Sequence, residues 1–291
     1  MMKQAKILFL IGMILFINIR STKEKNPNTD LSAALVFDSV RMVDLFKKYE
    51  ASLKPRKYIY LTIDDAPLNG SAYIDSIISV EKVKTSLFVV GSHIKESKRL
   101  LKSYESFRQN PYIEIYNHSY SHANNRYADF YKNPNSVYLD FERNQSELNI
   151  SRKIARLPGR DLWMLGDRKK NVRQTGTTAA ELLAKNGYDI FGWDVEWNFD
   201  PTDLTPKQSI DELIAEIEDL CHSPIAFTPN HVVLLIHNQM FGKLTTKNSL
   251  QELIEKLKDS NYSFEYLSSY SKLTNSHHKK DTLQTAASMS R

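Results

Sequence analysis

Short apolar runs alternate with amphipathic stretches along most of this 291-residue chain. Runs rich in β-branched and aromatic residues predict seven strands, at 58–63, 85–90, 112–116, 153–157, 188–193, 232–236 and 262–267. Patterns with helical spacing lie between them, at 92–109, 136–149, 177–187, 205–222 and 246–260. Strands that alternate with helices in this way predict parallel pairing, either in a barrel or in an open doubly wound sheet.

The N-terminal segment departs from this pattern. Lys3 and Lys6 precede an apolar run from Ile7 to Ile19, which is typical of a secretory signal peptide and short for a membrane span. No small-x-small cleavage pattern follows, so a retained membrane anchor is an open alternative. We therefore expect an exported protein, which is secreted, periplasmic or anchored in the membrane and facing outward.

The remaining composition divides the chain into five parts. These are a signal peptide or N-terminal membrane anchor (1–19), a polar linker (20–30), an N-terminal helix packing on the barrel (31–54), a catalytic domain (55–270) and a disordered polar tail (271–291). The lone Cys221 cannot form an internal disulfide, which is compatible with export.

Charge is unevenly distributed. The net charge of +5 comes from the ends, because residues 1–26 carry five Lys or Arg against one Glu and residues 271–291 carry four against one Asp. That is +4 and +3, and about −2 is left on the body between them. A nucleic-acid-binding face needs positive charge on the folded domain, so we expect no nucleic-acid partner. Nothing in the sequence indicates the oligomeric state.

Ionisable residues recur where the predicted strands end. Parallel α/β sheets gather their active sites at the carboxyl ends of their strands. Five of the predicted strands end in polar motifs. The first ends in Asp64-Asp65, the next in "NHSYSH" with His118 and His122, and the next in "RLPGRDLW" with Arg156 and Pro158. The last two end in "WDVEW", with Asp194, Glu196 and Trp197, and in His237. This recurrence at one end of the sheet predicts a single site.

The adjacent carboxylates and the paired histidines suggest a metal ion. Two imidazole nitrogens and one carboxylate make a zinc-type site that leaves a position for water. Asp64 and Asp65 converge only if the chain turns at the strand end, which Pro67 and Gly70 favour. Taken alone, the two histidines would more simply be an exposed pair, and the two aspartates a helix cap or a solvated loop. Only their combination favours a metal site.

Taken in order, the motifs resemble the polysaccharide deacetylase, or NodB-homology, family (carbohydrate esterase family 4). The resemblance covers roughly 55–270 and rests on "TIDDAP", "HSYSH", "RLPGR", "WDVEW" and "LLIH". It implies an α/β fold, a distorted (β/α) barrel with about seven strands.

The resemblance also implies roles for single residues. Asp65, His118 and His122 would bind a divalent metal, with Zn²⁺ first and Co²⁺, Mn²⁺ or Ni²⁺ as alternatives. Asp64 would be the general base and His237 the general acid. Arg156 would hold Asp64. Asp194, which we favour over Glu196, would support His237. Pro158, Gly159 and Trp197 would bind the substrate.

Three positions depart from the family pattern. Ala66 replaces a Gly, so this turn must avoid backbone angles that only Gly tolerates. Gly159-Arg160 follows Pro158 where an aromatic-Gly pair is usual, and Asn238 follows His237 where a carboxylate is common. Trp163 is another possible sugar platform. Five histidines match no motif, and we expect no role in the site for them, namely His93, His222, His231, His277 and His278.

The implied function is that of a hydrolase acting on carbon–nitrogen bonds other than peptide bonds. It would remove N-acetyl groups from an N-acetylated amino sugar polymer or oligomer, using metal-activated water, an Asp base and a His acid. Peptidoglycan, chitin-type oligomers and exopolysaccharides all satisfy this description. The alternatives are a catalytically impaired glycan-binding module and a relative that acts on another amide.

Overall fold

The computed structural model describes residues 41, 55–242 and 248–270. The chain divides into two compact units, 1–55 and 56–291, and nearly all described residues belong to the second. The predicted segments 1–19, 20–30 and 271–291, and the predicted helix 31–54 apart from Arg41, lie outside the described residues. Within the described residues, no helix combines the length and apolarity that crossing a membrane requires.

All seven predicted strands form. They are β1 (Lys57–Ala66), β2 (Thr85–Val89), β3 (Ile113–Asn117), β4 (Ile154–Ala155), β7 (Asp189–Ile190), β9 (His231–His237) and β10 (Tyr262–Phe264). Three more are present, β5 (Trp163–Leu165), β6 (Arg168–Lys170) and β8 (Val195–Glu196), so the sheet has ten strands and not about seven. Of these, β6 contains only Arg and Lys, so it has no hydrophobic pattern from which a strand could be predicted.

The sheet has the order β6-β5-β7-β4-β3-β2-β1-β9-β8, and β10 pairs with β1. Every pairing is parallel except those of β5, which is antiparallel to both β6 and β7. The predicted α/β class and the distorted barrel are confirmed, with β1 as the strand that pairs with three others. The antiparallel hairpin β5–β6 is the main departure from a regular (β/α) repeat.

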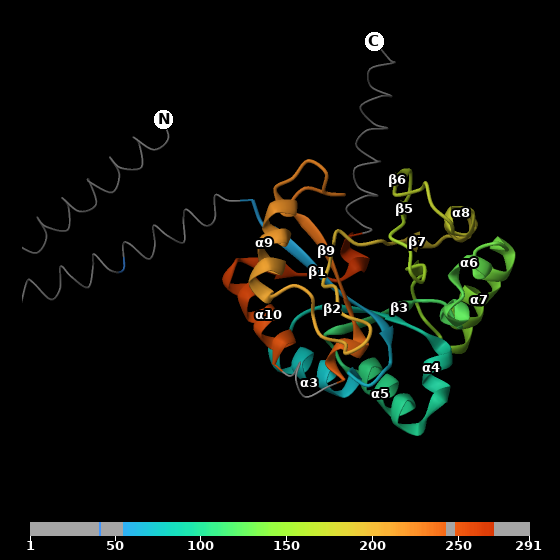
Figure 1. Cartoon of the computed structure of the whole chain (residues 1–291), viewed down its shortest axis with the longest axis horizontal. Helices are drawn as coiled ribbons and strands as arrows, with labels where there is room; N and C mark the ends of the chain where they lie inside the picture. Colours follow the sequence, from blue (N-terminus) through green and yellow to red (C-terminus); the bar gives the residue numbers. More distant parts are fainter. Residues whose placement is uncertain (1–40, 42–54, 243–247, 271–291) are drawn as a thin grey trace, which may run out of the picture. The chain divides into compact units, whose positions relative to one another are not determined.

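Helices lie around the outside of the strands (Figure 1). They are α3 (Ser71–Glu81), α4 (Gly91–Glu96), α5 (Lys98–Gln109), α6 (Tyr127–Phe130), α7 (Pro134–Glu147), α8 (Thr177–Lys185), α9 (Ile210–Cys221) and α10 (Ser249–Asp259). The predicted helix 92–109 is interrupted at Ser97, whose side chain accepts from the Leu100 N–H and caps α5. A capping box from Ser209 to Glu212 starts α9 later than the predicted 205.

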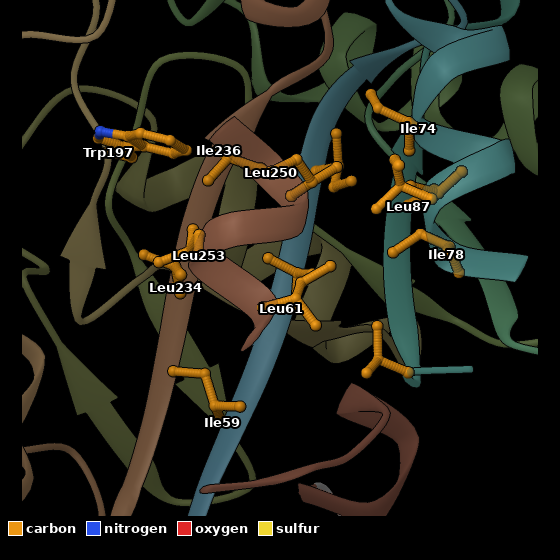
Figure 2. Close-up of a cluster of buried hydrophobic side chains, with 14 of the residues drawn as sticks. Ile59, Leu61, Ile74, Ile78, Leu87, Trp197, Leu234, Ile236, Leu250 and Leu253 are labelled. Carbon is orange, nitrogen blue, oxygen red and sulfur yellow. The ribbon is translucent and has the colours of Figure 1, made fainter. Parts of the chain in front are cut away.

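The two faces of β1 are used differently, because successive side chains of a strand point to opposite sides. Ile59 and Leu61 face outward into a core shared with α3 and α10 (Figure 2). Ile63 belongs to the same core. Tyr60 and Asp64 fall on the opposite, inner face. The outer face is therefore apolar and supports the helices, while the inner face can carry polar groups at its end.

An aromatic cluster fills the inner side of the barrel. Its members come from several strands and from the segments after them, and include Tyr60, Phe88, Tyr116, Trp163, Phe191, Phe227 and Tyr270. Trp163 is fully buried and stacks on Phe227 at 4.4 Å between ring centroids. The suggestion that Trp163 is a sugar platform is therefore wrong, since its ring is part of the core.

His231 lies at the opposite end of β9 from His237 and packs on this cluster. Its ring stacks on Tyr58 at 4.7 Å between centroids, and its Nδ1 forms a hydrogen bond of 2.8 Å with the Tyr60 hydroxyl. Burial lowers the pKa of His231 from 6.5 to about 4. The folded protein therefore keeps this imidazole neutral in mildly acidic solution.

This arrangement predicts a pH dependence of stability. Between about pH 6.5 and pH 4 the unfolded chain binds a proton at His231 that the folded protein does not. The free energy of unfolding therefore decreases as the pH is lowered through this range. Allowing for partial exposure, we expect His231 to account for roughly 1–2 kcal/mol of the loss. Urea denaturation at pH 7 and pH 4.5 should show a smaller loss for His231→Phe, which keeps a ring against Tyr58. Equal losses in the two proteins would contradict this role.

Candidate active site

A cavity of about 510 Å³ opens at the carboxyl ends of the parallel strands. Asp64, Asp65, His118, His122 and His237 all line it, although 173 positions separate the first from the last. Asp64 is the direct neighbour of His237 in the parallel register of β1 and β9, so both side chains reach the same face. The structure thus brings the predicted metal ligands, base and acid together at one place.

Asp64 is held by a buried guanidinium group. Arg156 has no exposed surface, and its Nη1 donates to Asp64 Oδ1 at 2.8 Å and to the Thr62 hydroxyl at 2.9 Å. Its Nε and Nη2 donate to the carbonyls of Phe191 and Gly192 at 3.2 and 2.8 Å. The charge of Arg156 is therefore paired and each of its three nitrogens donates a hydrogen bond, as a buried cation requires. Asp64 Oδ2 is left free of Arg156.

Asp65 has a left-handed backbone, with φ of 65°. Asp tolerates this region better than most residues, and the turn lets two adjacent carboxylates converge on one side. The expectation for Ala66 agrees with the structure, because Ala66 is not among the residues with positive φ. It belongs to β1, is fully buried and pairs with Val89. The strained angle thus falls on Asp65 and not on Ala66.

His118 and His122 are presented by a tight loop after β3, not by a helical turn. Ser119 and His122 both have positive φ, and the Ser119 hydroxyl accepts from the His122 N–H at 3.0 Å. Asp140 of α7 accepts from the N–H groups of Tyr120 and Ser121 at 3.0 Å each. These side-chain bonds replace the regular backbone pattern and fix the direction of both imidazoles.

Each imidazole is oriented through its Nδ1. His118 Nδ1 donates to the carbonyl of Arg156 at 2.9 Å, and His122 Nδ1 faces Asn125 Oδ1 at 3.4 Å. Both Nε2 atoms consequently point at Asp65 Oδ1, at 3.5 Å from His118 and 3.0 Å from His122. Burial alone would raise the pKa of Asp65, but the two imidazoles outweigh it and hold that pKa well below its usual range.

These three atoms fit a metal ion. One nitrogen from each histidine and one Asp65 oxygen lie within 4.8 Å of one another. Both Nδ1 atoms are engaged elsewhere as donors, so two nitrogen lone pairs and a carboxylate oxygen converge on one point. A divalent cation satisfies such a donor set, and the arrangement is the usual three-ligand pattern with room for water.

The predicted support of His237 has to be corrected. Asp194 is directed away from it, because its carboxylate accepts from the N–H groups of Val233 at 3.0 Å and Phe227 at 3.5 Å, beside Lys170. Glu196 lies opposite His237 instead, with 3.9 Å between Oε1 and Nδ1. Burial raises the pKa of Glu196. Asp194 lies just before β8 and its carboxylate binds backbone N–H groups of Phe227 and Val233, whereas Glu196 lines the cavity. The two carboxylates therefore do not lie on the same side.

Two of the three predicted substrate-binding residues also lie elsewhere. Trp197 is 1% exposed and its Nε1 donates to the Gln208 carbonyl, so it belongs to the core. Pro158 is buried and does not line the cavity. Gly159 does line it, with φ of 64°. The wall of the cavity is aromatic through other residues, namely Tyr127, Trp193 and Phe199.

Tyr127 and Arg160 explain the unusual "RLPGR" motif. A Cβ on Gly159 would lie 3.3 Å from the Tyr127 ring, and the Arg160 guanidinium lies 5.8 Å from the centre of that ring. Tyr127 also meets His122 edge to face at 5.8 Å. An aromatic ring from α6 thus stands beside Gly159, where the sequence motif has none, and only the fold makes this visible.

Asn238 has a structural role that the sequence did not indicate. It is fully buried, its Oδ1 accepts from the Leu68 N–H at 3.1 Å, and its Nδ2 donates to the Ser71 hydroxyl at 3.1 Å. Gly70 packs so closely that an added Cβ would lie 2.1 Å from the Asn238 carbonyl oxygen. The amide provides both a donor and an acceptor here, and the contact ties the end of β9 to the turn after Pro67.

Breaking the Arg156–Asp64 pair should be strongly destabilising. Arg156→Met leaves a buried, uncompensated carboxylate, which typically lowers the free energy of unfolding by about 3–5 kcal/mol. The double variant Arg156→Met, Asp64→Asn removes both charges and should recover part of this loss. Urea denaturation of the wild type, both single variants and the double variant measures the coupling. A double variant no more stable than Arg156→Met would contradict the ion pair as the cause.

The chain was compared with known proteins. Residues 51–159 match the sequence model of the family described as polysaccharide deacetylase, a segment that contains Asp64, Asp65, His118, His122 and Arg156. The peptidoglycan-N-acetylglucosamine deacetylase of Bacillus cereus is 24% identical over 220 residues, which cover 73% of this chain and 70% of that protein.

Solved structures agree in fold. A carbohydrate esterase family 4 enzyme from Streptococcus mutans superposes with a TM-score of 0.55 at 21% identity, over 72% of this chain and 86% of that one. The catalytic domain of a peptidoglycan N-acetylglucosamine deacetylase from Eubacterium rectale gives a TM-score of 0.53 at 19% identity, over 73% and 89%. The resemblance seen in the motifs is confirmed over residues 51–159, which match the model of the polysaccharide deacetylase family.

Proposed function

We propose that this protein is a metal-dependent hydrolase that removes N-acetyl groups from an N-acetylated amino sugar polymer or oligomer. One observation carries the proposal. A three-ligand metal site, a carboxylate held by a buried arginine and a histidine beside a second carboxylate all line the same cavity. The name of the Bacillus cereus relative, a peptidoglycan-N-acetylglucosamine deacetylase, supports this class of substrate.

The metal would be held by Asp65, His118 and His122. Two imidazole nitrogens and one carboxylate favour Zn²⁺, with Co²⁺, Mn²⁺ and Ni²⁺ as alternatives. When bound, such an ion polarises an amide carbonyl and lowers the pKa of a water molecule. The described residues would position the reactants around it.

Asp64 acts as the general base in this proposal. Arg156 holds its Oδ1, so Oδ2 is the oxygen that takes the proton from the attacking water. The same ion pair keeps the carboxylate in one orientation during the reaction. Gly159 lines the cavity, and in this proposal its N–H stabilises the negative charge that develops on the carbonyl oxygen.

His237 acts as the general acid. Its Nδ1 faces Glu196, so its Nε2 is the nitrogen that can give a proton to the departing sugar amine. A sugar amine is a poor leaving group unless it is protonated, and the Glu196 carboxylate stabilises the imidazolium that makes this transfer possible. The rings of Tyr127, Trp193 and Phe199 offer apolar surfaces to the faces of the sugar.

Export is part of the proposal. Lys3, Lys6 and the apolar run to Ile19 support a signal peptide or an outward-facing membrane anchor, and a cell-wall glycan would be met outside the cell. Peptidoglycan, chitin-type oligomers and exopolysaccharides remain the candidate substrates within this class. A glycan-binding protein without turnover is the competing function.

The central test is acetate release from N-acetylglucosamine oligomers by zinc-loaded protein, repeated with a chelator. Asp64→Asn should reduce turnover by at least about 10²-fold while the protein still binds zinc, because the base is lost and the ligands are kept. His118→Ala should lose zinc, whereas His222→Ala, at an exposed histidine, should not. Elemental analysis of the three variants separates these outcomes. Oligomer binding without acetate release from the wild type would favour the glycan-binding protein.

The acid side of the mechanism has its own test. Glu196→Gln should lower kcat by about 10- to 100-fold with zinc content unchanged, because the imidazolium of His237 loses its carboxylate. Asp194→Asn is the matched control, since that side chain serves the backbone of Phe227 and Val233. It should lower the thermal stability and leave kcat nearly unchanged. A larger loss of kcat in Asp194→Asn than in Glu196→Gln would reverse the assignment.

A further inference from the structure

We propose that His93 is a further functional residue of the cavity, with a different task for each ring nitrogen. Its Nδ1–H positions the ligand Asp65, and its Nε2 accepts a hydrogen bond from a hydroxyl group of the bound sugar. The second task rests on the proposed function, whereas the first concerns the metal site alone. His93 belongs to none of the five motifs.

The contact of His93 with Asp65 is made through the backbone. Its Nδ1 lies 3.0 Å from the Asp65 carbonyl oxygen. A carbonyl oxygen only accepts, so this nitrogen carries the proton. The register of β1 with β2 shifts between Ile63 and Ala66, and Asp65 has a positive φ at this irregular point. The imidazole therefore fixes a peptide group that regular sheet pairing does not, and with it the direction of the Asp65 carboxylate.

The helix that carries His93 is anchored to the ligand loop. Ser92 N–H donates to the Tyr120 carbonyl at 2.9 Å, within the loop that presents His118 and His122. A Cβ at Gly91 would lie 2.5 Å from Asn144 Oδ1 and 2.6 Å from the Tyr120 ring, so α4 begins in close contact with that loop. His93 thus links the segment of Asp65 to the segment of the two histidine ligands.

The second nitrogen of His93 faces a different environment. With Nδ1 protonated, Nε2 of the neutral imidazole carries a lone pair and can only accept. His93 lines the cavity, and among the described residues no hydrogen bond or ion pair engages its Nε2. Its ring centre lies 6.3 Å from that of His122, and its nitrogens are not part of the group of three converging ligand atoms. A sugar, which is rich in hydroxyl donors, matches this acceptor.

Two amide substitutions separate the tasks. In His93→Asn the amide nitrogen takes the place of Nδ1 and keeps the bond to Asp65, but nothing replaces Nε2. In His93→Gln the amide reaches the place of Nε2 and its oxygen can accept from the sugar, but the donor to Asp65 is lost. His93→Ala removes both groups. His222→Asn is the control, because His222 is 61% exposed and pairs only with Glu218 among the described residues.

The first measurement is the zinc dissociation constant of each apoprotein, by competition with a chromophoric chelator. We expect His93→Asn and His222→Asn to stay within about twofold of the wild type, and His93→Gln and His93→Ala to bind zinc about tenfold more weakly, as for other residues that orient a ligand. Wild-type affinity in correctly folded His93→Ala, judged by circular dichroism, would overturn the positioning role. This result does not depend on any turnover.

The second measurement is calorimetric binding of the N-acetylglucosamine tetramer to zinc-loaded protein, with KM where acetate is released. His93→Asn should weaken binding about 3- to 10-fold, the usual effect of one hydrogen bond, and His93→Gln should restore part of it. Tetramer affinity of His93→Asn equal to that of the wild type would overturn the acceptor role. If the wild type binds the tetramer but releases no acetate, the hydrolase proposal fails, while both roles of His93 are still decided by these affinities.

Discussion

The buried guanidinium of Arg156 is the interaction on which the rest of the site depends. Its side chain joins the Asp64 carboxylate of β1 to carbonyls beside β7, and its own carbonyl accepts from His118 Nδ1. A cation with no exposed surface must satisfy every donor within the protein. That requirement fixes the positions of β1, β4 and the segment after β7 together, and so orients both the proposed base Asp64 and the proposed metal ligand His118.

The register of the parallel strands adds the second constraint. Asp64 and His237 are neighbours on β1 and β9, so the base and the acid of the proposed reaction face one cavity without any long-range adjustment. Asp65 would point to the other face if β1 continued regularly. Its left-handed backbone and the His93 imidazole hold it on the same side as Asp64. The left-handed backbone of Asp65 therefore brings its carboxylate to the same side as that of Asp64, although adjacent residues of a regular strand point to opposite faces.

Where a motif residue differs from the family pattern, a residue from another part of the fold lies at the same place in the cavity. Tyr127 of α6 stands beside Gly159, and Glu196 faces His237 where the motif suggested Asp194. Asn238 needs both a donor and an acceptor to hold the turn at Leu68 and Ser71, so an amide suits it better than a carboxylate. The motif positions vary, while the cavity is still lined by the residues of the proposed metal site, acid and base and by aromatic rings.

Periodicity and strand-end motifs were enough to predict the α/β class and seven of the ten strands. They also predicted the convergence of Asp64, Asp65, His118, His122 and His237, because parallel strands deliver their carboxyl ends to one edge. They were not enough for the hairpin β5–β6, the burial of Trp163 and Trp197, the choice of Glu196 over Asp194, or the presence of His93 in the cavity. Those features depend on contacts between residues far apart in the chain and on backbone angles at single residues. Neither kind of feature leaves a periodic pattern in a sequence. Only the tertiary structure, in which the curved sheet packs on its aromatic core, determines them.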